Sequence, residues 1–326
     1  MKMKKSIPKI ITVTLNPSLD RTLTVHHLAA DYYNYTTDQT RLDSAGNGVN
    51  ISRALHLLGG DTEAIVLLGD DATGKAYHAL ISEEHFETYV IRREGKTRSD
   101  NIIVDTGTDT ETHLVEEGVA TTNEPIEMVQ ATINEIMNDG DFVVLAGTLP
   151  THMPSDTFKI LGENVKANGG HVVLFTSGEA LTQCLLAKPD MVVLRQVDVE
   201  TQFNIPIRVA DDVLYGIQKI RQNGVGKVLV IEVGEDEDAL LVTADGHWSE
   251  SIAKVVKGTS SGIVDSLIAG FLYKSINDSS LADSLQYGSV STLYTATRFG
   301  NEFGTQLEID TLLTAQSEEA LQLHMS

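Results

Sequence analysis

The second half of the chain alternates short apolar runs with helical patterns, and this alternation constrains the fold more than any other feature. Each predicted strand follows a predicted helix: Ile126–Met137 then Phe142–Ala146, Asp156–Asn168 then His171–Phe175, Glu179–Ala187 then Met191–Leu194, and Ala210–Gln222 then Lys227–Glu232. The strands are continuously apolar, which indicates burial on both faces. The pattern predicts an α/β fold of three layers, with a central, mostly parallel sheet covered by helices.

The first part of the chain combines the same alternation of buried strands and helices with a set of short, partly polar strands. Ile10–Leu15 and Glu63–Leu68 are predicted as further buried strands, with helices opening at Ala45-Gly-Asn-Gly48 and spanning Gly74–Glu83. Short, partly polar strands interrupt this rhythm at Thr22–Val25, Thr36–Leu42, Tyr89–Ile91, Asn101–Asp105 and Thr112–Val115. They predict a separate small sheet, formed by segments near 20–42 and 89–116. Because ligands bind at the carboxyl ends of parallel strands, such a sheet could cover the site as a lid.

The last part of the chain adds two antiparallel strands and two long helices. Ala239–Val242 and His247-Trp248 predict the strands, and Asp265–Ser275 and Leu281–Arg298 are predicted to close the chain. No repeat, low-complexity tract or linker interrupts the sequence, so we expect residues 1–326 to form a single domain.

Composition narrows the class of partner and the compartment. The formal net charge of −22 excludes a nucleic-acid partner, since phosphate backbones need clustered cations. No segment approaches the roughly 20 apolar residues of a membrane span. The N-terminal Met-Lys-Met-Lys-Lys lacks the apolar run and cleavage site of a signal peptide, and the lone Cys184 fits a reducing compartment. A cytoplasmic protein is therefore expected.

A loop of small residues, Gly258-Thr-Ser-Ser-Gly262, runs directly into an apolar helical pattern with Asp265 at the junction. Such a loop lets backbone amides come close to a ligand, and the first amides of a helix have no intrahelical partners. These amides and the helix dipole favour phosphates. Asp265 is then either an N-cap or a base for a group that attacks the phosphate, and the local residues leave both roles open.

Four other stretches place polar groups near the same edge. Asp20 could accept hydrogen bonds from sugar hydroxyls or simply form a turn, and Arg98 in Lys96-Thr-Arg98 could hold a phosphate or lie solvated. Thr148 follows a strand end over Gly147. The Gly-rich stretch 43–50 enters a helix, but Ile51 replaces the third glycine of a dinucleotide fingerprint, which argues against an oxidoreductase.

Taken together and in this order, these motifs resemble the ribokinase-like carbohydrate kinases of the phosphofructokinase B type, within them the branch of 1-phosphofructokinase and tagatose-6-phosphate kinase. The resemblance spans nearly the whole chain and rests on TVTLNPSLDRT (12–22), AGNGVNISRAL (45–55), KTR (96–98), VVLAGTLP (143–150), TSGEAL (176–181), AKPD (187–190) and GIVDSLIAGF (262–271).

The resemblance implies the fold, the ligands and the residue roles. It implies a ribokinase-like sheet with a β lid, ATP and Mg²⁺ as cofactors, and a ketohexose phosphate as substrate, either fructose 1-phosphate or tagatose 6-phosphate. It implies Asp265 as the catalytic base with Gly262 beside it. The residues it implies on the sugar-phosphate side are Asp20, Gly46, Asn47, Gly48, Asn50, Arg98 and Thr148. Those it implies on the nucleotide side are Arg195, Glu232, Gly234, Ser260, Ser261, Gly262, Ile263 and Val264, with Asp198 near the metal.

Several positions depart from the family pattern. Asn47 replaces a lysine, so one cation near the sugar phosphate is missing, and Val264 replaces a glycine, so the anion-binding turn is expected to be reshaped. Arg195 replaces a polar residue of the motif that organises Mg²⁺; it would repel the ion and could contact phosphates itself. Glu232-Val-Gly234 and Phe175 also differ from the usual residues.

Two functions therefore remain open. The first is an active ATP-dependent kinase for a ketohexose phosphate, favoured by Asp265, Asp20, Asn50 and Arg98. The second is a catalytically weak or inactive protein that binds nucleotide or sugar phosphate as a sensor, favoured by Val264, Asn47 and Arg195. A homodimer through an exposed lid edge is expected with either.

Overall fold

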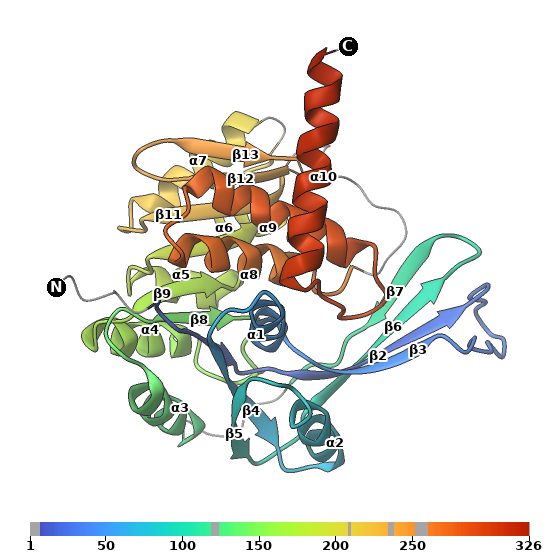
Figure 1. The fold of residues 1–326 in the computed structure, drawn as a ribbon. Coiled ribbons are helices and arrows are strands. Elements are labelled where there is room, and N and C mark those ends of the chain that lie inside the picture. Colours follow the sequence, from blue (N-terminus) through green and yellow to red (C-terminus); the bar gives the residue numbers. More distant parts are fainter. Residues whose placement is uncertain (1–6, 119–123, 208–209, 234–237, 252–259, 326) are drawn as a thin grey trace.

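The computed structural model describes residues 7–118, 124–207, 210–233, 238–251 and 260–325. Their main feature is a sheet of nine strands in the order β13-β12-β11-β10-β9-β8-β1-β4-β5 (Figure 1). The strands span β1 Ile10–Thr14, β4 Thr62–Gly69, β5 Glu87–Arg93, β8 Phe142–Ala146, β9 His171–Phe175, β10 Met191–Arg195, β11 Lys227–Val233, β12 Asp238–Val242 and β13 His247–Glu250. In this sheet of the described residues, β12 pairs antiparallel with both β11 and β13, and the other neighbouring strands are parallel; the sequence predicts this antiparallel addition.

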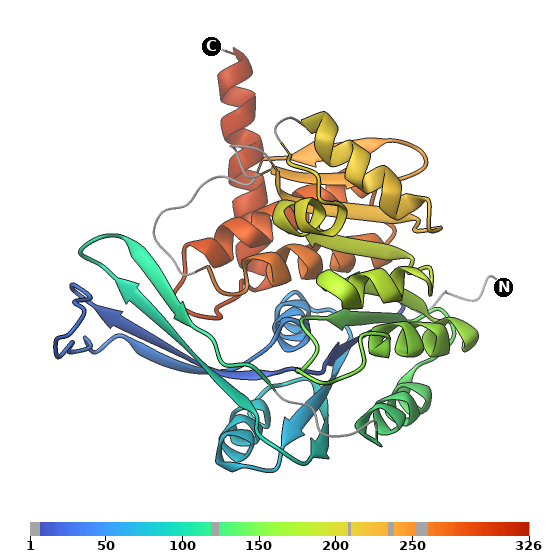
Figure 2. The ribbon, with the colours of Figure 1, turned by 180° about the vertical axis from the view of Figure 1, so that it is seen from behind.

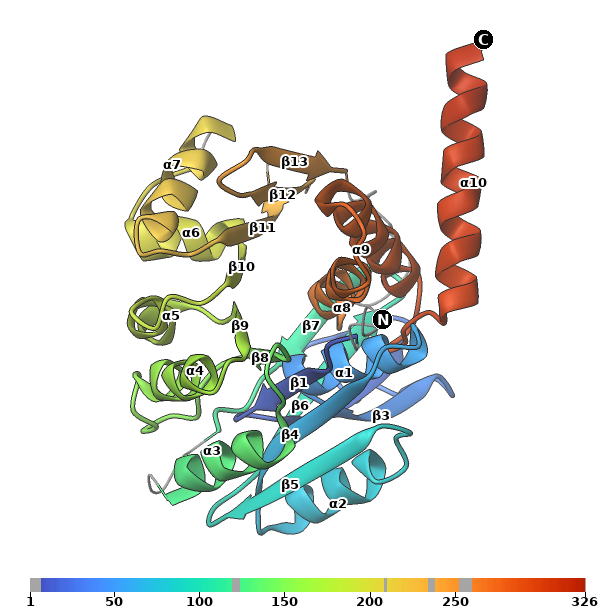
Figure 3. The same ribbon diagram turned by 60° about the vertical axis from the view of Figure 1, so that its left-hand side comes forward.

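Helices cover both faces of this sheet (Figure 3). Helices α3 Glu124–Ile136, α4 Thr157–Ala167, α5 Gly178–Leu185 and α7 Ala210–Arg221 pack on one face, and α1 Asn47–Leu57, α8 Ile263–Ile276 and α9 Leu281–Ala296 on the other. Within β8, Val143 and Leu145 join the first core and Val144 the second. Because successive strand residues point to opposite faces, an uninterrupted apolar run fills both cores, and the predicted three-layer fold is confirmed.

The second sheet has four strands in the order β3-β2-β6-β7 and extends away from the helical layers (Figure 2). The strands are β2 Ser18–Val25, β3 Thr40–Ala45, β6 Arg98–Asp105 and β7 Thr110–Leu114. The central pair, β2 and β6, is parallel, with Ser18 opposite Arg98 and Val25 opposite Asp105. We call these four strands the lid.

Four details of the prediction are wrong. The region near 89 belongs to β5, an edge strand of the main sheet, because only part of that strand is covered and it therefore reads as polar. A short helix, α6 Gln196–Phe203, follows β10 directly, and α8 begins at Ile263 rather than Asp265. The chain also continues after α9 into α10, Gln306–Met325, whose apolar face is narrow: Ile309 is buried, with Leu312 and Leu313 packed beside it.

The order of the strands fixes where a ligand can bind. From β1 the chain moves outward to β4 and β5, and then returns to β8 on the other side of β1. The carboxyl end of β1 is therefore a topological switch point, where connections leave in opposite directions and open a crevice. Helices α1 and α8, which contact each other closely, begin beside this crevice; α2 Ala72–Ile81 lies farther out, against β4.

Candidate active site

A cavity of about 400 Å³ lies at the carboxyl ends of β8, β9 and β10 and at the start of α8. Its lining includes Gly147, Thr176 and Arg195 from the strand ends and Gly262 and Asp265 from the start of α8. We call it the phosphate cavity, because a helix start with unpaired amides is suited to anionic oxygens.

The turn before α8 depends on Gly262. This residue is the N-cap of the helix and has a φ of 76°, in the left-handed region that glycine adopts without strain. A Cβ at this position would lie 2.8 Å from the Phe303 ring. Val264 lies inside the helix and has no positive φ, so its position needs no glycine-like backbone.

Asp265 is buried at the floor of the phosphate cavity and its two oxygens have separate partners. The side-chain amide of Asn47 donates to Oδ1 and that of Asn50 donates to Oδ2, both at 2.8 Å. The helix start has no capping hydrogen bond from a side chain. Of the two roles left open for Asp265, the N-cap is thereby excluded, because Gly262 holds that position, and Asp265 lines the phosphate cavity.

Burial raises the pKa of Asp265 to about 6, against the opposing effects of the Asn47 and Asn50 hydrogen bonds and the nearby Arg53 charge. The two amides favour the ionised form and desolvation favours the neutral form. Near neutral pH the group is therefore mostly ionised and still has useful affinity for a proton, which is the condition that a general base requires.

A second cavity of about 340 Å³ adjoins the first and is bounded by the lid. Both linings contain Asn47, Gly147 and Thr148, so the two cavities form one two-part cleft. Arg98, from the start of β6, lines only the second cavity. Its guanidinium pairs with Asp100 at 2.5 Å and donates to the Asn16 carbonyl at 3.2 Å. We call this second part the lid cavity.

Three aspartates lie side by side across the lid strands. Asp20 on β2 is directly opposite Asp43 on β3 and Asp100 on β6. Burial raises the pKa of Asp20 to about 7; the Ser18 hydroxyl, which donates to Asp20 at 2.5 Å, opposes this shift, and the Asp100 and Asp43 charges add to it. A carboxyl with this pKa can accept or donate a hydrogen bond near neutral pH.

Arg195 does reach the phosphate cavity, but as half of an ion pair. Its Nε and Nη2 atoms donate to the two carboxylate oxygens of Asp198, each at 3.1 Å. Both oxygens that the sequence assigns to a metal are thus occupied by a cation. Within the described residues, no group of three or more acidic, histidine or cysteine side chains could hold a metal ion. The described residues therefore form no all-protein cage for Mg²⁺, an ion that proteins usually hold through one or two carboxylates together with substrate phosphates and water.

The lid contacts the loop that leads into α8. The Ser260 hydroxyl donates to Glu111 Oε2 at 2.6 Å, and the Ser260 backbone N–H lies 3.0 Å from Glu111 Oε1. His113 pairs with the same Glu111 carboxylate at 3.1 Å, and this hydrogen bond raises the pKa of His113. Strand β7 thus contacts Ser260, a residue that lines the phosphate cavity.

The remaining predicted residues separate into two groups. Ser260, Ile263, Val264, Glu232 and Asp198 line the phosphate cavity, and Thr148 lines both cavities. Among the described residues, neither lining includes Asp20, Gly46, Gly48, Asn50 or Ser261.

Gly46, the N-cap of α1, and Gly48 in its first turn allow close packing. A Cβ on Gly46 would lie 2.7 Å from a side-chain atom of Thr14, and a Cβ on Gly48 would overlap the Thr14 hydroxyl. They therefore let α1 start against the end of β1. Gly234 and Gly258 lie outside the described residues.

The sequence reasoning missed two residues beside Asp265. Arg53 donates to the Asn50 side-chain carbonyl at 3.0 Å, and Asn301 lies within 3.4 Å of the Asn50 amide nitrogen. The three-residue spacing of Asn50 and Arg53 on one helix was a usable signal for the first contact. Asn301 follows α9 in a stretch without a helical or strand pattern, so no sequence signal pointed to it.

Comparison with known proteins agrees with this geometry. The model of the pfkB family carbohydrate kinases matches residues 13–306. The chain is 31% identical to the 1-phosphofructokinase of Bacillus subtilis (strain 168) over 93% of this chain and 97% of that protein. It is 25% identical to the ATP-dependent 6-phosphofructokinase isozyme 2 of Escherichia coli (strain K12), over 91% of this chain and 97% of that one.

A solved structure shares the fold. The crystal structure of the phosphofructokinase-2 from Escherichia coli in complex with potassium superimposes with a TM-score of 0.86 and 22% sequence identity, covering 95% of this chain and 99% of that chain. The family match covers most of the 326 residues, including Asp265. The chain belongs to the pfkB family of carbohydrate kinases.

Proposed function

We propose that this protein is an ATP-dependent kinase that phosphorylates a hydroxyl of a ketohexose phosphate, with fructose 1-phosphate as the first candidate. The observation that carries the proposal is the position of Asp265: a buried carboxylate at a helix start, inside a phosphate cavity that opens into a lid cavity with an arginine. The curated 1-phosphofructokinases among the relatives support fructose 1-phosphate, and tagatose 6-phosphate has less direct support.

The two parts of the cleft suggest how the substrates lie. Nucleotide phosphates would bind at the first amides of α8, with Gly262 leaving room for them, and the sugar would lie under the lid with its phosphate toward Arg98. Asp265 would accept the proton of the attacking hydroxyl, which then forms the new bond to the γ-phosphorus while ADP leaves.

ATP is the co-substrate that the family implies, and a bound nucleotide would also bring ligands for a metal ion. Because Arg195 occupies both oxygens of Asp198, we propose that any Mg²⁺ arrives with the nucleotide and is held mainly by its phosphates and water. Arg195 would then add positive charge near the phosphates from the protein side.

A coupled assay of ADP release tests the proposal. The purified protein is given ATP with fructose 1-phosphate, fructose 6-phosphate or tagatose 6-phosphate, and the corresponding free sugars serve as controls. We expect turnover with one of the phosphates and little with free sugars. Turnover with none of them, together with measurable ATP binding by calorimetry, would favour the sensor function, which Arg195 and Asn47 still support.

We also propose that two copies associate through their lids. The outer strands of the lid, β3 and β7, carry the exposed apolar side chains of Leu42 and Leu114. The loop between β2 and β3 adds Tyr32, Tyr33 and Tyr35, each at least 80% exposed. Apolar groups on free strand edges favour edge pairing. Light scattering should then give twice the mass of the chain for the native protein and the single mass for Leu114→Arg.

A further inference from the structure

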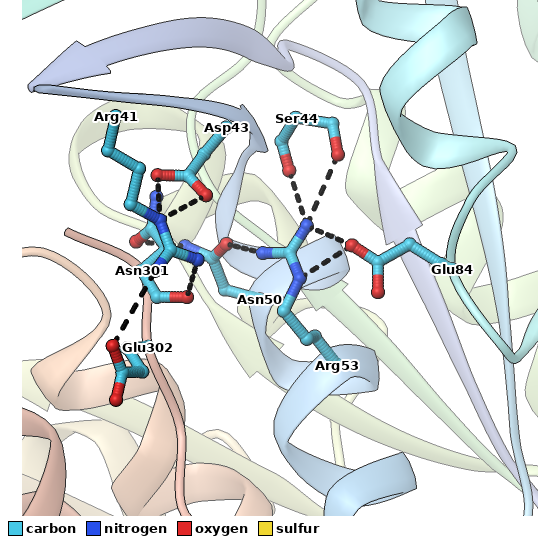
Figure 4. A network of polar contacts seen from close by, with 8 residues as sticks. All are labelled: Arg41, Asp43, Ser44, Asn50, Arg53, Glu84, Asn301 and Glu302. Atoms are coloured by element: carbon cyan, nitrogen blue, oxygen red, sulfur yellow. Dashed lines mark hydrogen bonds and ion pairs between the residues drawn. The ribbon is translucent and has the colours of Figure 1, made fainter.

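We propose that Arg53 is a positioning residue that orients the Asn50 amide toward Asp265. Its guanidinium also links this amide to Ser44, near the end of lid strand β3; we call this end of β3 the root of the lid. The inference rests on the proposed role of Asp265 as the base. Arg53 lies on α1 and is not among the described residues that line either cavity, so its effect would be exerted through its neighbours. Figure 4 shows these neighbours around its guanidinium.

The orientation of the Asn50 side chain follows from the chemistry of its two ends. The carbonyl Oδ1 can only accept a hydrogen bond, and the Nδ2 group can only donate. Arg53 Nη1 donates to Oδ1 at 3.0 Å, and Nδ2 in turn donates to Asp265 at 2.8 Å. If the amide turned over, its oxygen would face the carboxylate and its nitrogen would face a guanidinium, and both contacts would be repulsive. Arg53 therefore fixes which end of the amide reaches the base.

The other nitrogens of Arg53 connect the base to the lid. Nη2 donates to the carbonyl oxygen of Ser44 at 2.8 Å and lies 3.2 Å from the Ser44 hydroxyl, at the end of lid strand β3. Nε donates to Glu84 at 2.7 Å, which balances the charge of a side chain that is only 11% exposed. The rigid fork of a guanidinium can serve these three partners at once, whereas an ammonium group is a single point of donation.

Arg41 gives a matched comparison, because it lies on β3, the lid strand that Arg53 contacts through Ser44. It pairs with Asp43 at 2.7 Å and donates to the backbone oxygen of Asn301 at 3.1 Å (Figure 4). Arg41 therefore also anchors the root of the lid. Within the described part of the chain Arg41 makes no hydrogen bond to the Asn50 carbonyl, so a change of Arg41 tests the anchoring of the lid without removing the partner of that carbonyl.

The test measures the pKa of Asp265 directly, by carbon NMR of protein labelled at the aspartate carboxyl carbons. The Asp265 signal is assigned by its absence in Asp265→Asn. Loss of an oriented donor to an ionised carboxylate should raise its pKa. We expect Arg53→Met to raise the pKa of Asp265 by about one unit and to lower kcat several-fold, with little change in the KM for ATP.

Two variants distinguish orientation from a simple effect of charge. Arg53→Lys keeps the positive charge and a partner for Glu84, so it should fold even if Arg53→Met does not, and we still expect the upward shift. In an Asn50→Ala background, Arg53→Met should add little, because the amide through which it acts is gone. Arg41→Met should leave the pKa of Asp265 unchanged.

Three results would overturn the proposal: a wild-type pKa in Arg53→Lys, the same shift from Arg53→Met with and without Asn50, or an equal shift from Arg41→Met. The NMR readout needs no turnover. An inactive wild-type protein would therefore count against the proposed function and leave the role of Arg53 to be decided by the titration.

Discussion

Asn47 of α1 donates its side-chain amide to Oδ1 of Asp265 at the start of α8, at 2.8 Å, and this contact lies where the phosphate cavity meets the lid cavity. The Asn47 side chain is neutral and binds the carboxylate, so Arg98 is the cationic side chain among the described residues that line the lid cavity. The predictions below start from this arrangement.

The first prediction concerns the base itself. Asp265→Asn removes proton acceptance, and a positioned base contributes roughly 10²- to 10⁴-fold to the rate. We expect kcat to fall by at least about 100-fold while calorimetry shows nearly unchanged affinity for ATP. The melting temperature, measured on the same preparation, serves as the control for folding. A variant that keeps more than about a tenth of the wild-type turnover would remove Asp265 from the chemistry.

The second prediction concerns pH. Since burial raises the pKa of Asp265 to about 6, its proton-accepting form is lost as the pH falls through 6. The plot of kcat against pH should therefore decline tenfold per unit below about pH 6 and level off above it. An acid limb near pH 4, the usual range of an aspartate, would contradict the assignment of this group as the base.

The third prediction is that replacing Asp20 raises the stability of the protein and lowers its affinity for the substrate. Its pKa is about 7 in the folded protein and about 3.8 when unfolded, so stability is lost as the pH rises between these values. Asp20→Asn removes the free-energy cost of ionising a buried carboxyl, and the amide oxygen of the new side chain can still accept the hydrogen bond from the Ser18 hydroxyl. We expect the free energy of unfolding to rise by about 1–3 kcal/mol at pH 8, with the gain disappearing near pH 4. Urea unfolding at both pH values measures it, and substrate affinity should fall in the same variant.

The fourth prediction separates the two parts of the cleft. Arg98 lines the lid cavity and not the phosphate cavity, so Arg98→Ala should raise the KM for the sugar phosphate by tenfold or more and leave the KM for ATP within about twofold. Arg98→Lys, which keeps the charge that faces Asp100, is the matched control and should recover part of the loss. Equal changes for both substrates would place Arg98 outside the sugar site.

The fifth prediction concerns the turn into α8. Gly262→Ala forces a side chain into a left-handed backbone and brings its Cβ within 2.8 Å of Phe303. We expect a loss of about 1–2 kcal/mol in stability and a larger relative loss in ATP affinity, because the turn carries the amides that face the phosphates. Gly140→Ala also changes a glycine with positive φ, but it meets no atom within 4 Å, and it should affect stability alone.

Sequence patterns predicted the main sheet well, because its strands are apolar without interruption and its helices have the matching period. The same patterns misplaced β5 and did not separate α6 or α10, where burial is partial and the apolar signal is weak. The sequence motifs predicted that Asp265, Arg98 and Arg195 lie around one cleft, and all three line its two parts. The pairing of Arg195 with Asp198, and the use of Asn47 and Asn50 as partners of Asp265, depend on side-chain distances that no spacing rule encodes.

The parallel pairing of β2 with β6 determines when the lid can form. Strands β2 and β3 leave the ribosome first, and β2 has an unpaired edge until β6 follows. Between β3 and β6 the chain forms β4 and β5, which belong to the main sheet, and the helices α1 and α2, which pack against it. The lid is thus completed only after part of the core has been synthesised, and the nascent chain carries an open strand edge in the meantime. For the same reason no single excised segment contains the lid alone, and grafting it onto another scaffold would require two separate insertions.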